Sequence, residues 1–311
     1  MDRPHLQPDL VRELHQSRHG HFLRFVIFAV LYAIAAAVLY RVVISRPHSI
    51  LFWLACVPIY LLAAASLHGI SLFTHEAVHG TLSGNPILNH AMGAVCAWPV
   101  LQNFAAYKVL HLRHHSHLGD AGDPDHYQNY TRWTWMLFAM YWGRLILGYP
   151  AYITMIPVLG YRQGNKAERF WIIFEVFCVV ALVAVAICSP VPRILLIHAW
   201  LIPMLFINTL VNIRGMSQHT LLEHHSDPIL GTRSILTNRV TAFFMCNENY
   251  HLEHHLYPGV PWYNLRRLHG ALREDLEARG APYIDSYFAF VREFVVGSLR
   301  RSPLGRRLDS H

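Results

Sequence analysis

His251-Leu-Glu-His254-His255 is a stretch of five residues with histidines at positions i, i+3 and i+4. The same spacing occurs at His111-Leu-Arg-His114-His115, and a shorter form, i and i+4, occurs at His75-Glu-Ala-Val-His79. On an α-helix, residues three and four apart lie on one face, so each stretch can direct two or three imidazoles towards a common point. Neutral imidazole is a favoured ligand of iron, zinc and copper. Three such stretches, separated by long apolar segments, predict a metal centre assembled at a membrane.

The composition is that of a membrane protein. Of the 311 residues, 53% are hydrophobic and 14% are charged, and this charged fraction is well below the roughly 25% of a soluble globular domain. Four apolar segments have about the 20 residues that a helix needs to cross the hydrocarbon layer. They are residues 25–44, 50–73, 170–189 and 194–213. We therefore predict an all-α membrane protein with four transmembrane helices, rather than a large soluble protein with buried helices.

Two further segments, residues 86–107 and 133–159, are apolar but less regular. Prolines interrupt them, at Pro86, Pro99, Pro150 and Pro157. We expect helices that lie in the membrane interface or dip partly into it. The alternative is one more hairpin through the bilayer.

The arginines predict the orientation in the membrane. Four of them precede the first apolar segment, and twelve lie between Arg214 and Arg307. The positive-inside rule then places both termini in the cytoplasm. Four crossings bring all three histidine stretches to that side. We expect a single domain, residues 1–311, with a cytoplasmic helical cap made of residues 74–169 and 214–275 and a charged C-terminal tail, residues 276–311.

The net charge of +7 requires no nucleic acid as a partner. Lipid headgroups and the cytoplasmic surface explain a basic membrane protein. The sequence contains no motif for binding RNA or DNA.

Taken alone, the first stretch matches the HExxH signature of zinc metalloproteases, in which Glu76 would be the general base. That interpretation leaves ten other histidines in metal-like segments unexplained. A closed zinc site takes four ligands at most, so this number of imidazoles suggests two metal ions. The ten are His111, His114, His115, His117, His219, His224, His225, His251, His254 and His255.

Carboxylates stand beside the histidine stretches, and some are expected to accept the second ring N–H of a ligand histidine. The alternative for each is a solvated surface position. They are Glu76, Asp120, Asp123, Asp125, Glu248 and Glu253.

Longer motifs surround the histidines. They are Thr74-His-Glu-Ala-Val-His-Gly80, His111-Leu-Arg-His-His-Ser-His117 with Asp123-Pro-Asp125, and Asn249-Tyr-His-Leu-Glu-His-His-Leu-Tyr-Pro258, which continues to Leu265 with His269 beyond. With these motifs the chain resembles the integral-membrane fatty acid desaturase family over roughly residues 50–275.

The resemblance implies a cytoplasmic di-iron centre held by nine histidines, one of which precedes the third stretch. That extra histidine is expected to be His219, in Arg214-Gly-Met-Ser-Gln-His219, with His224 and His225 as alternatives. His117 falls outside the pattern, and Gln218 stands where family members often have Glu. The nine expected ligands are His75, His79, His111, His114, His115, His219, His251, His254 and His255.

The chemistry that the resemblance implies is oxidation of an unactivated C–H bond with O2 as co-substrate and two Fe ions as cofactor. The substrate would be a lipid or acyl chain from the bilayer, and a separate protein, a ferredoxin or a cytochrome, would donate electrons. Introduction of a double bond into a fatty acyl chain is favoured. The alternative on the same scaffold is a hydroxylase or ketolase of a carotenoid or another lipid. A bis-histidine haem protein or a metal transporter fits less well, because most of the clusters lie outside the apolar segments.

Four other polar residues lie within apolar segments. We expect His68 to be a hydrogen-bonded buried residue or to line the approach to the metals, and His198 to lie in the membrane interface. Asn208 and Asn212 are expected to face the protein interior, since polar groups within a membrane usually do.

Overall fold

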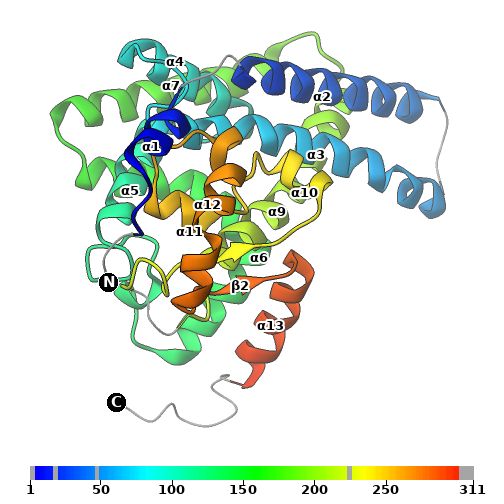
Figure 1. Ribbon diagram of the computed structural model, residues 1–311. Coiled ribbons are helices and arrows are strands. Elements are labelled where there is room, and N and C mark those ends of the chain that lie inside the picture. The colour runs from blue at the N-terminus through cyan, green and yellow to red at the C-terminus, as the bar shows by residue number, and fades with distance from the viewer. Residues whose placement is uncertain (1–3, 17–19, 46–48, 223–225, 301–311) are drawn as a thin grey trace. The chain divides into compact units, whose positions relative to one another are not determined.

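The computed structural model describes residues 4–16, 20–45, 49–222 and 226–300, and helices dominate this part of the chain (Figure 1). The only strands among these residues are β1 (Ser234–Ile235) and β2 (Tyr283–Ile284), which pair in parallel. The longer helices are α1 (Pro8–Leu14), α2 (Gly20–Ile44), α3 (Ile50–Val78), α4 (Pro86–Ala97), α5 (Phe104–Ser116), α6 (Thr134–Gln163), α7 (Lys166–Cys188), α9 (Ile202–His219), α10 (Arg239–Phe244), α11 (His251–Leu256), α12 (Leu265–Ala278) and α13 (Tyr287–Arg300). Short helical turns are η1 (Trp98–Val100), η2 (Tyr127–Asn129), α8 (Arg193–Leu196), η3 (Ile197–Leu201) and η4 (Trp262–Asn264).

Four helices of the described chain are long and apolar enough to cross a membrane. They are Gly20–Ile44, Ile50–Val78, Lys166–Cys188 and Arg193–His219. The prediction of an all-α protein with four such helices is confirmed. Two of these helices run further than their apolar segments at the C-terminal end. As a result, His75 lies on the same helix as the second segment, and His219 lies on the same helix as the fourth.

The chain packs as two compact units. Unit 1 comprises Met1–Gln16, Leu110–Gly148 and Asn212–His311, and unit 2 comprises Ser17–Val109 and Tyr149–Val211. The division falls within α5, α6 and α9. Unit 2 therefore contains the first histidine stretch, and unit 1 contains the other two stretches and His219.

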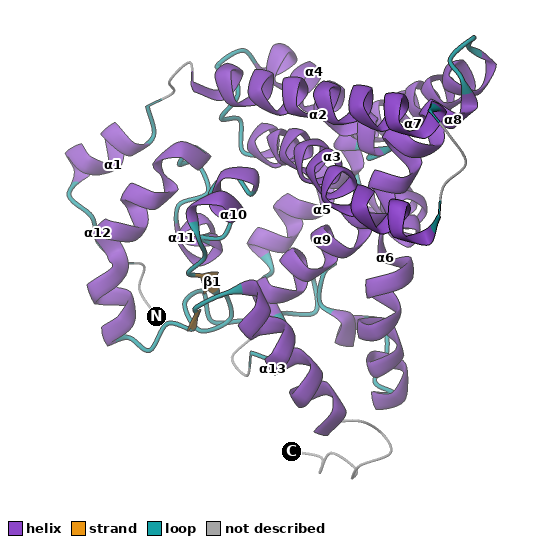
Figure 2. Ribbon diagram, turned by 90° about the vertical axis from the view of Figure 1, so that its right-hand side faces the viewer, coloured by secondary structure: helices purple, strands orange, loops and turns teal. Residues whose placement is uncertain are grey.

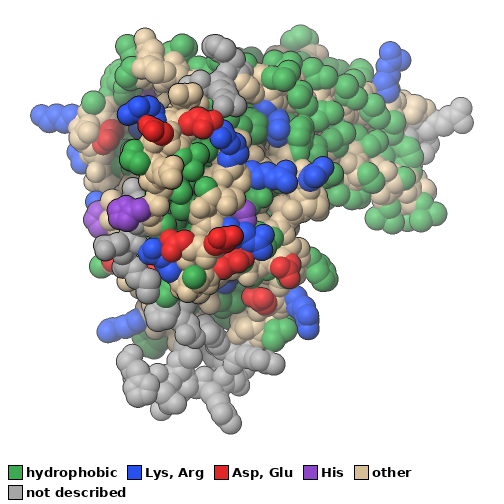
Figure 3. Space-filling view, viewed as in Figure 1, with side chains coloured by type: hydrophobic (Ala, Val, Ile, Leu, Met, Phe, Trp, Pro, Cys, Tyr) green, Lys and Arg blue, Asp and Glu red, His purple; other side chains and the backbone are tan. Residues whose placement is uncertain are grey.

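In unit 2, α2 packs along α3 (Figure 1). The two helices approach closely at Gly69, where a Cβ atom would lie 2.5 Å from the ring of Phe28. Large apolar side chains of α2, including Val26, Val30 and Ile34, are exposed, and apolar side chains cover this part of unit 2 (Figure 3). Such a surface suits contact with lipid chains, because apolar side chains have no hydrogen-bonding groups that hydrocarbon would leave without partners.

The expected interruption of α6 at Pro150 and Pro157 does not occur, since both prolines lie inside one helix. Tertiary contacts in unit 2 support the helix there. The backbone N–H of Tyr149 donates to Oδ1 of Asn208 at 2.8 Å, and the Tyr149 hydroxyl donates to the carbonyl of Val100 at 2.8 Å. A proline inside a helix is tolerated where neighbouring groups satisfy the backbone atoms that it frees. Asn208 is buried, as expected for a polar residue within an apolar segment.

In unit 1, α1 lies against α12 (Figure 2). The side-chain amide of Asn264 donates to the carbonyl of Leu14 at 2.7 Å, and Arg267 pairs with Glu13 at 3.0 Å. The predicted tail contains β2 and α13, and residues 301–311 lie outside the described chain. The described part of the tail contributes to the core of unit 1, because the cluster of Met216, Ile235, Ile284, Phe290 and Phe294 is buried.

Candidate metal centre

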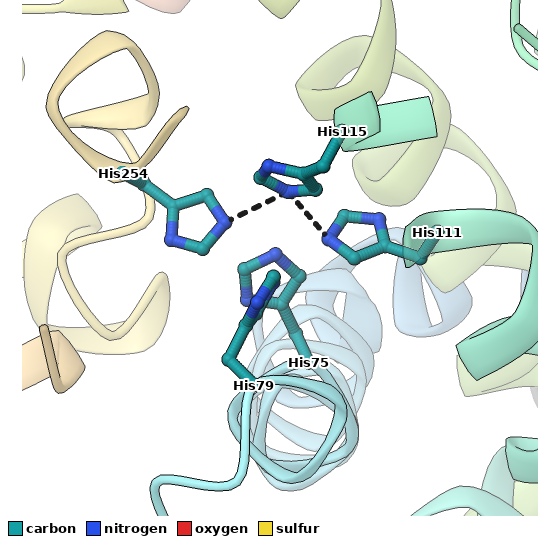
Figure 4. A group of neighbouring side chains, drawn as sticks. All are labelled: His75, His79, His111, His115 and His254. Carbon is teal, nitrogen blue, oxygen red and sulfur yellow. Dashed lines mark hydrogen bonds between the residues drawn. The ribbon is translucent and has the colours of Figure 1, made fainter. Parts of the chain in front are cut away.

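The first histidine stretch lies at the end of α3 in unit 2. His75 is in the last turn and His79 is the C-terminal cap, with ring centroids 5.1 Å apart (Figure 4). The helix stops here because Gly80 adopts a left-handed φ of 73°, and the N–H groups of Gly80 and Thr81 return to carbonyls of the last turn. This hydrogen-bond pattern satisfies carbonyls that a helix end leaves free. The two imidazoles therefore leave α3 side by side.

The protonation state of His79 suits a metal ligand. Burial lowers the pKa of His79 well below its ordinary value, and the charges of His75 and Lys108 lower it further. A histidine that is neutral at pH 7 offers a ring lone pair without first losing a proton.

The second stretch is carried by α5, whose first turn is anchored in unit 2. Oδ1 of Asn103 accepts the N–H of Ala106 at 2.8 Å, and the carboxylate of Glu175 accepts the N–H of Ala105 at 3.0 Å. These acceptors serve N–H groups that have no partner within the helix. The three histidines of the stretch follow in the last turns of α5, within unit 1.

Asp123 orients His114. The Nδ1–H of His114 donates to Oδ1 of Asp123 at 2.8 Å, and both side chains are buried. Burial opposes a charged imidazole, but the hydrogen bond to Asp123 and the charges of Asp125 and Asp123 outweigh it and raise the pKa of His114. Burial likewise opposes a charged Asp123, and the contact with His114 together with the N–H groups of Gly119 and Asp125 lowers the pKa of Asp123. Because Nδ1 holds the proton of the neutral ring, the Nε2 lone pair is left for a metal.

Group A is our name for His111, His115 and His254, which meet in unit 1. Nε2 of His115 lies 3.0 Å from Nε2 of His111 and 3.2 Å from Nε2 of His254 (Figure 4). No oxygen atom takes part in these two contacts, and a single Nε2 proton can serve only one of them. A metal ion would accept all three lone pairs at once.

Group B is our name for His114, His219, His251 and His255, also in unit 1. The Nδ1–H of His219 donates to the carbonyl of Gly231 at 3.0 Å, which leaves Nε2 of the neutral ring unprotonated. That Nε2 lies 3.2 Å from Nε2 of His251, which lies 3.1 Å from Nε2 of His255. Ligand atoms of His114, His219 and His255 all lie within 4.8 Å of one another. The rings of His115 and His255 stack at 4.1 Å, so groups A and B are neighbours.

The nitrogen spacing in both groups fits metal ligation. With metal–nitrogen distances of about 2.1 Å, two ligands at right angles are about 3.0 Å apart, and two tetrahedral ligands are about 3.4 Å apart. The Nε2 contacts range from 3.0 to 3.2 Å. Burial, followed by the charges of the surrounding histidines, lowers the pKa of His255 well below its ordinary value. Neutral imidazoles in this number suit iron, zinc or copper.

The structure therefore brings seven of the nine expected ligands together in unit 1 and pairs the other two, His75 and His79, in unit 2. The alternatives His224 and His225 lie outside the described residues. His117 belongs to neither group, since its Nδ1 contacts Oγ of Ser116 at 2.8 Å and the carbonyl of Arg113 at 3.2 Å.

Two other histidines, His68 and His198, lie in unit 2. His68 is buried in α3. His198 is expected at the membrane interface, and it makes specific contacts inside the unit. Nδ1 of His198 lies 2.5 Å from the hydroxyl of Tyr60, and its ring stacks on Trp53 at 5.0 Å.

The carboxylates divide between ligand histidines and other partners. Asp123 accepts the Nδ1–H of His114, which is an expected metal ligand. Glu253 accepts the Nδ1–H of His269 at 2.6 Å, and His269 is not an expected ligand. Glu253 is fully buried and also accepts hydrogen bonds from Ser234 at 2.5 Å and from Tyr283 at 3.1 Å. Glu253 thus ties α11 to β1, α12 and β2.

Sequence reasoning did not identify the residues that hold His219 and α11 in place. They lie in residues 231–235, Gly-Thr-Arg-Ser-Ile. This segment matches no motif. Its importance rests on hydrogen bonds to residues distant in sequence, which a pattern in the chain does not reveal.

Comparison with known proteins gives a family match. The family model described as "Fatty acid desaturase" matches residues 51–287. This range includes all nine expected ligands and the segment 231–235.

Curated relatives include several kinds of enzyme. The chain is 22% identical to the sn-1 oleoyl-lipid 12-desaturase of Arthrospira platensis, over 69% of this chain and 67% of that protein. It is 24% identical to the dihydrorhizobitoxine desaturase of Bradyrhizobium elkanii, over 83% and 78%. It is 28% identical to a beta-carotene ketolase of a Paracoccus strain, over 63% and 72%.

Proposed function

Because the chain belongs to the fatty acid desaturase family, and is therefore an oxidoreductase, we propose that it uses O2 and two Fe ions to oxidise C–H bonds of a lipid. Introduction of a double bond into a fatty acyl chain is the favoured reaction. The observation that carries the proposal is the convergence of seven imidazoles in unit 1. In six of them Nε2 lies 3.0–3.2 Å from the Nε2 atom of another, and the seventh, His114, lies within 4.8 Å of two of these. The family match supports it, as does the number of histidines, which exceeds what one closed zinc site can use.

Nine histidines are proposed to hold the two ions. Group B contributes His114, His219, His251 and His255. Group A contributes three ligands, and His75 and His79 are proposed as the remaining two. The full set is His75, His79, His111, His114, His115, His219, His251, His254 and His255. When bound, such a centre supplies the O2 activation that cleavage of an unactivated C–H bond requires.

The protein's own residues prepare the donors. Asp123 and the carbonyl of Gly231 hold the Nδ1 protons of His114 and His219, so both rings present Nε2. Burial keeps His79 and His255 neutral, because it lowers the pKa of each. Both effects arrange the site before a metal arrives, which reduces the reorganisation that binding requires.

Membrane insertion and orientation form part of the proposal. Four apolar helices suit an integral, multi-pass protein that takes a lipid or acyl substrate from the bilayer. The arginine-rich termini support a cytoplasmic position for both ends, for the histidine stretches and for the helical cap. A cytoplasmic ferredoxin or cytochrome is then the proposed electron donor, and nucleic acid has no part.

The alternative reaction is hydroxylation or ketolation of a carotenoid or another lipid, which the similarity to the Paracoccus ketolase favours. Mass spectrometry of the lipids of a host that expresses the protein separates the two. Loss of two hydrogens supports desaturation, and gain of oxygen supports the alternative. Unchanged lipids, in a host that supplies ferredoxin and both substrate classes, would contradict both. The HExxH metalloprotease interpretation accounts for His75, Glu76 and His79 and for neither group A nor group B.

A further inference from the structure

Arg233 caps the end of α9, next to His219. Its backbone N–H donates to the carbonyl of Gln218 at 2.9 Å, and its Nη1 donates to the carbonyls of Ser217 and Thr220 at 3.0 and 3.3 Å. Arg233 is buried, with 4% of the residue exposed. The last carbonyls of a helix have no partners within the helix and favour a positive charge nearby. Arg233 therefore fixes the turn of α9 that carries His219.

Gly231 adds a direct contact two residues earlier. Its carbonyl accepts the Nδ1–H of His219 at 3.0 Å. Gly231 and Arg233 belong to the same short segment, residues 231–235, so the contacts of Arg233 with α9 also hold the Gly231 carbonyl in place. The segment thus holds both the backbone and the ring of His219.

The other end of the segment holds α11. Oγ of Ser234 accepts the N–H of Leu252 at 3.0 Å and donates to Oε2 of Glu253 at 2.5 Å. Ile235 and Asn249 exchange two hydrogen bonds, from the Ile235 N–H to the Asn249 carbonyl at 2.8 Å and from the Asn249 side-chain amide to the Ile235 carbonyl at 2.9 Å. These contacts surround the first turn of α11, where His251 begins the third stretch.

We infer that residues 231–235 form a bracket that sets the 3.2 Å separation of the His219 and His251 Nε2 atoms, with Arg233 and Ser234 as positioning residues of group B. One end of the bracket holds α9 and the other holds α11, so a shift at either end changes the ligand spacing. The inference rests on the proposed function in that group B is taken to hold a metal ion. The hydrogen bonds of Arg233 and Ser234 go to backbone carbonyls, to the N–H of Leu252 and to Glu253, so both residues position the ligands and are not ligands themselves.

The bracket is tested with Arg233→Met, which has similar bulk and no donors, and Arg233→Lys, which keeps the charge. The matched control is Arg273→Met, because Arg273 is exposed and pairs with Glu277 within α12. Each full-length protein, purified in detergent and stripped of metal, is titrated with Co2+ while its absorption spectrum is recorded. Arg233→Met is expected to weaken one of the two Co2+ sites by roughly 10- to 100-fold and to change its spectrum, as losses of groups that orient ligands do. Arg233→Lys should fall between it and the wild type, and Arg273→Met should match the wild type.

Ser234→Ala tests the other end of the bracket. It also allows the proposal to be tested if Arg233→Met does not fold. The control is Ser298→Ala, because Oγ of Ser298 donates to the Val295 carbonyl of its own helix. Ser234→Ala should weaken and alter the same Co2+ site as Arg233→Met, and Ser298→Ala should not. Folded Ser234→Ala or Arg233→Met protein that binds two Co2+ with wild-type affinity and spectrum would overturn the bracket and leave the proposed function intact. Wild-type protein that binds fewer than two ions would overturn the proposed function and, with it, the bracket.

Discussion

The Nδ1–H of His114 donates to Oδ1 of Asp123 at 2.8 Å while the His114 ring lies 4.9 Å from the ring of His219. Nδ1 of this imidazole is therefore hydrogen-bonded to a buried carboxylate, and Nε2 is left to bind a metal in group B. A carboxylate behind a ligand histidine raises the basicity of the ring and fixes its tautomer.

Asp123→Asn is expected to weaken metal binding in group B by roughly 10- to 100-fold. The amide keeps the size of the side chain but loses the negative charge and can present an N–H to Nδ1. Asp125→Asn is the matched control from the same loop. Its side chain is 63% exposed and 4.0 Å from His114, so its effect should be smaller. Titration with Fe2+ under anaerobic conditions measures the metal affinity of both variants. Equal affinities in wild type and Asp123→Asn would contradict the role given to Asp123.

Anaerobically purified protein is expected to contain close to two iron ions per chain, because groups A and B each contain at least three imidazoles. Metal analysis by mass spectrometry checks the number. One zinc ion and no iron would contradict the di-iron proposal and favour a zinc metalloprotease with the HExxH motif.

The free energy of unfolding of the metal-free protein is expected to fall as the pH drops below about 6.5, the ordinary histidine pKa. Burial lowers the folded-state pKa of His79 and His255, so the unfolded chain binds protons that the folded chain excludes, and acid favours unfolding. The raised pKa of His114 acts in the opposite direction, because its contribution is present below the unfolded value and is lost as the pH rises through the folded value. Melting temperatures from pH 5 to 8 measure the net result of these two opposing effects on stability.

His255→Gln is the variant that isolates this effect. It removes one of the histidines whose pKa burial lowers, so the loss of melting temperature in acid should become smaller. Two results would show that these histidines do not control how stability depends on pH. One is a wild-type melting temperature that rises on acidification, and the other is a His255→Gln protein whose melting temperature changes with pH as steeply as that of the wild type.

His219→Ala is expected to abolish turnover while the protein stays folded, because it opens one coordination position of group B. His198→Ala is the contrasting variant. It loses the contact with Tyr60 and the stacking on Trp53, which costs on the order of 1 kcal/mol in stability, and it should keep most of the activity. Lipid product formation and melting temperature are measured for both. If His219→Ala remained active and His225→Ala did not, the ninth ligand would have been assigned to the wrong residue.

Much of the fold could be predicted because hydrophobicity and helix length are local properties. The four apolar segments lie within, or end close to, the four long helices, and the segment ending at Phe73 continues as helix to Val78. The course of α6 could not be predicted from its own residues. Pro150 and Pro157 are helix breakers in isolation, and contacts such as that from Tyr149 to Asn208 become visible only when the chain is folded.

In the candidate metal centre, too, local features could be predicted from the sequence and tertiary contacts could not. The spacing of the histidines predicted which imidazoles share a helix face, and the seven in unit 1 do converge. Their partners were less accessible to prediction. Glu253 stands between two expected ligands in sequence, yet its carboxylate faces away to His269. Ser234 and Arg233 act across the chain, so neither composition nor spacing marks them.

The orientation of the membrane helices gives a final test. Arginines concentrate at the N-terminus and beyond Arg214, and each near the membrane favours the cytoplasmic side. A reporter that is active only in the cytoplasm, fused after His311, should therefore be active. A cysteine placed at Thr81, beside the first histidine pair, should react with a membrane-permeant thiol reagent and not with an impermeant one added outside. The five native cysteines are first replaced by serine or alanine, because all are free. Labelling of Thr81→Cys from outside would place His79 on the opposite side of the membrane. In that case a cytoplasmic ferredoxin or cytochrome could not approach the proposed centre directly.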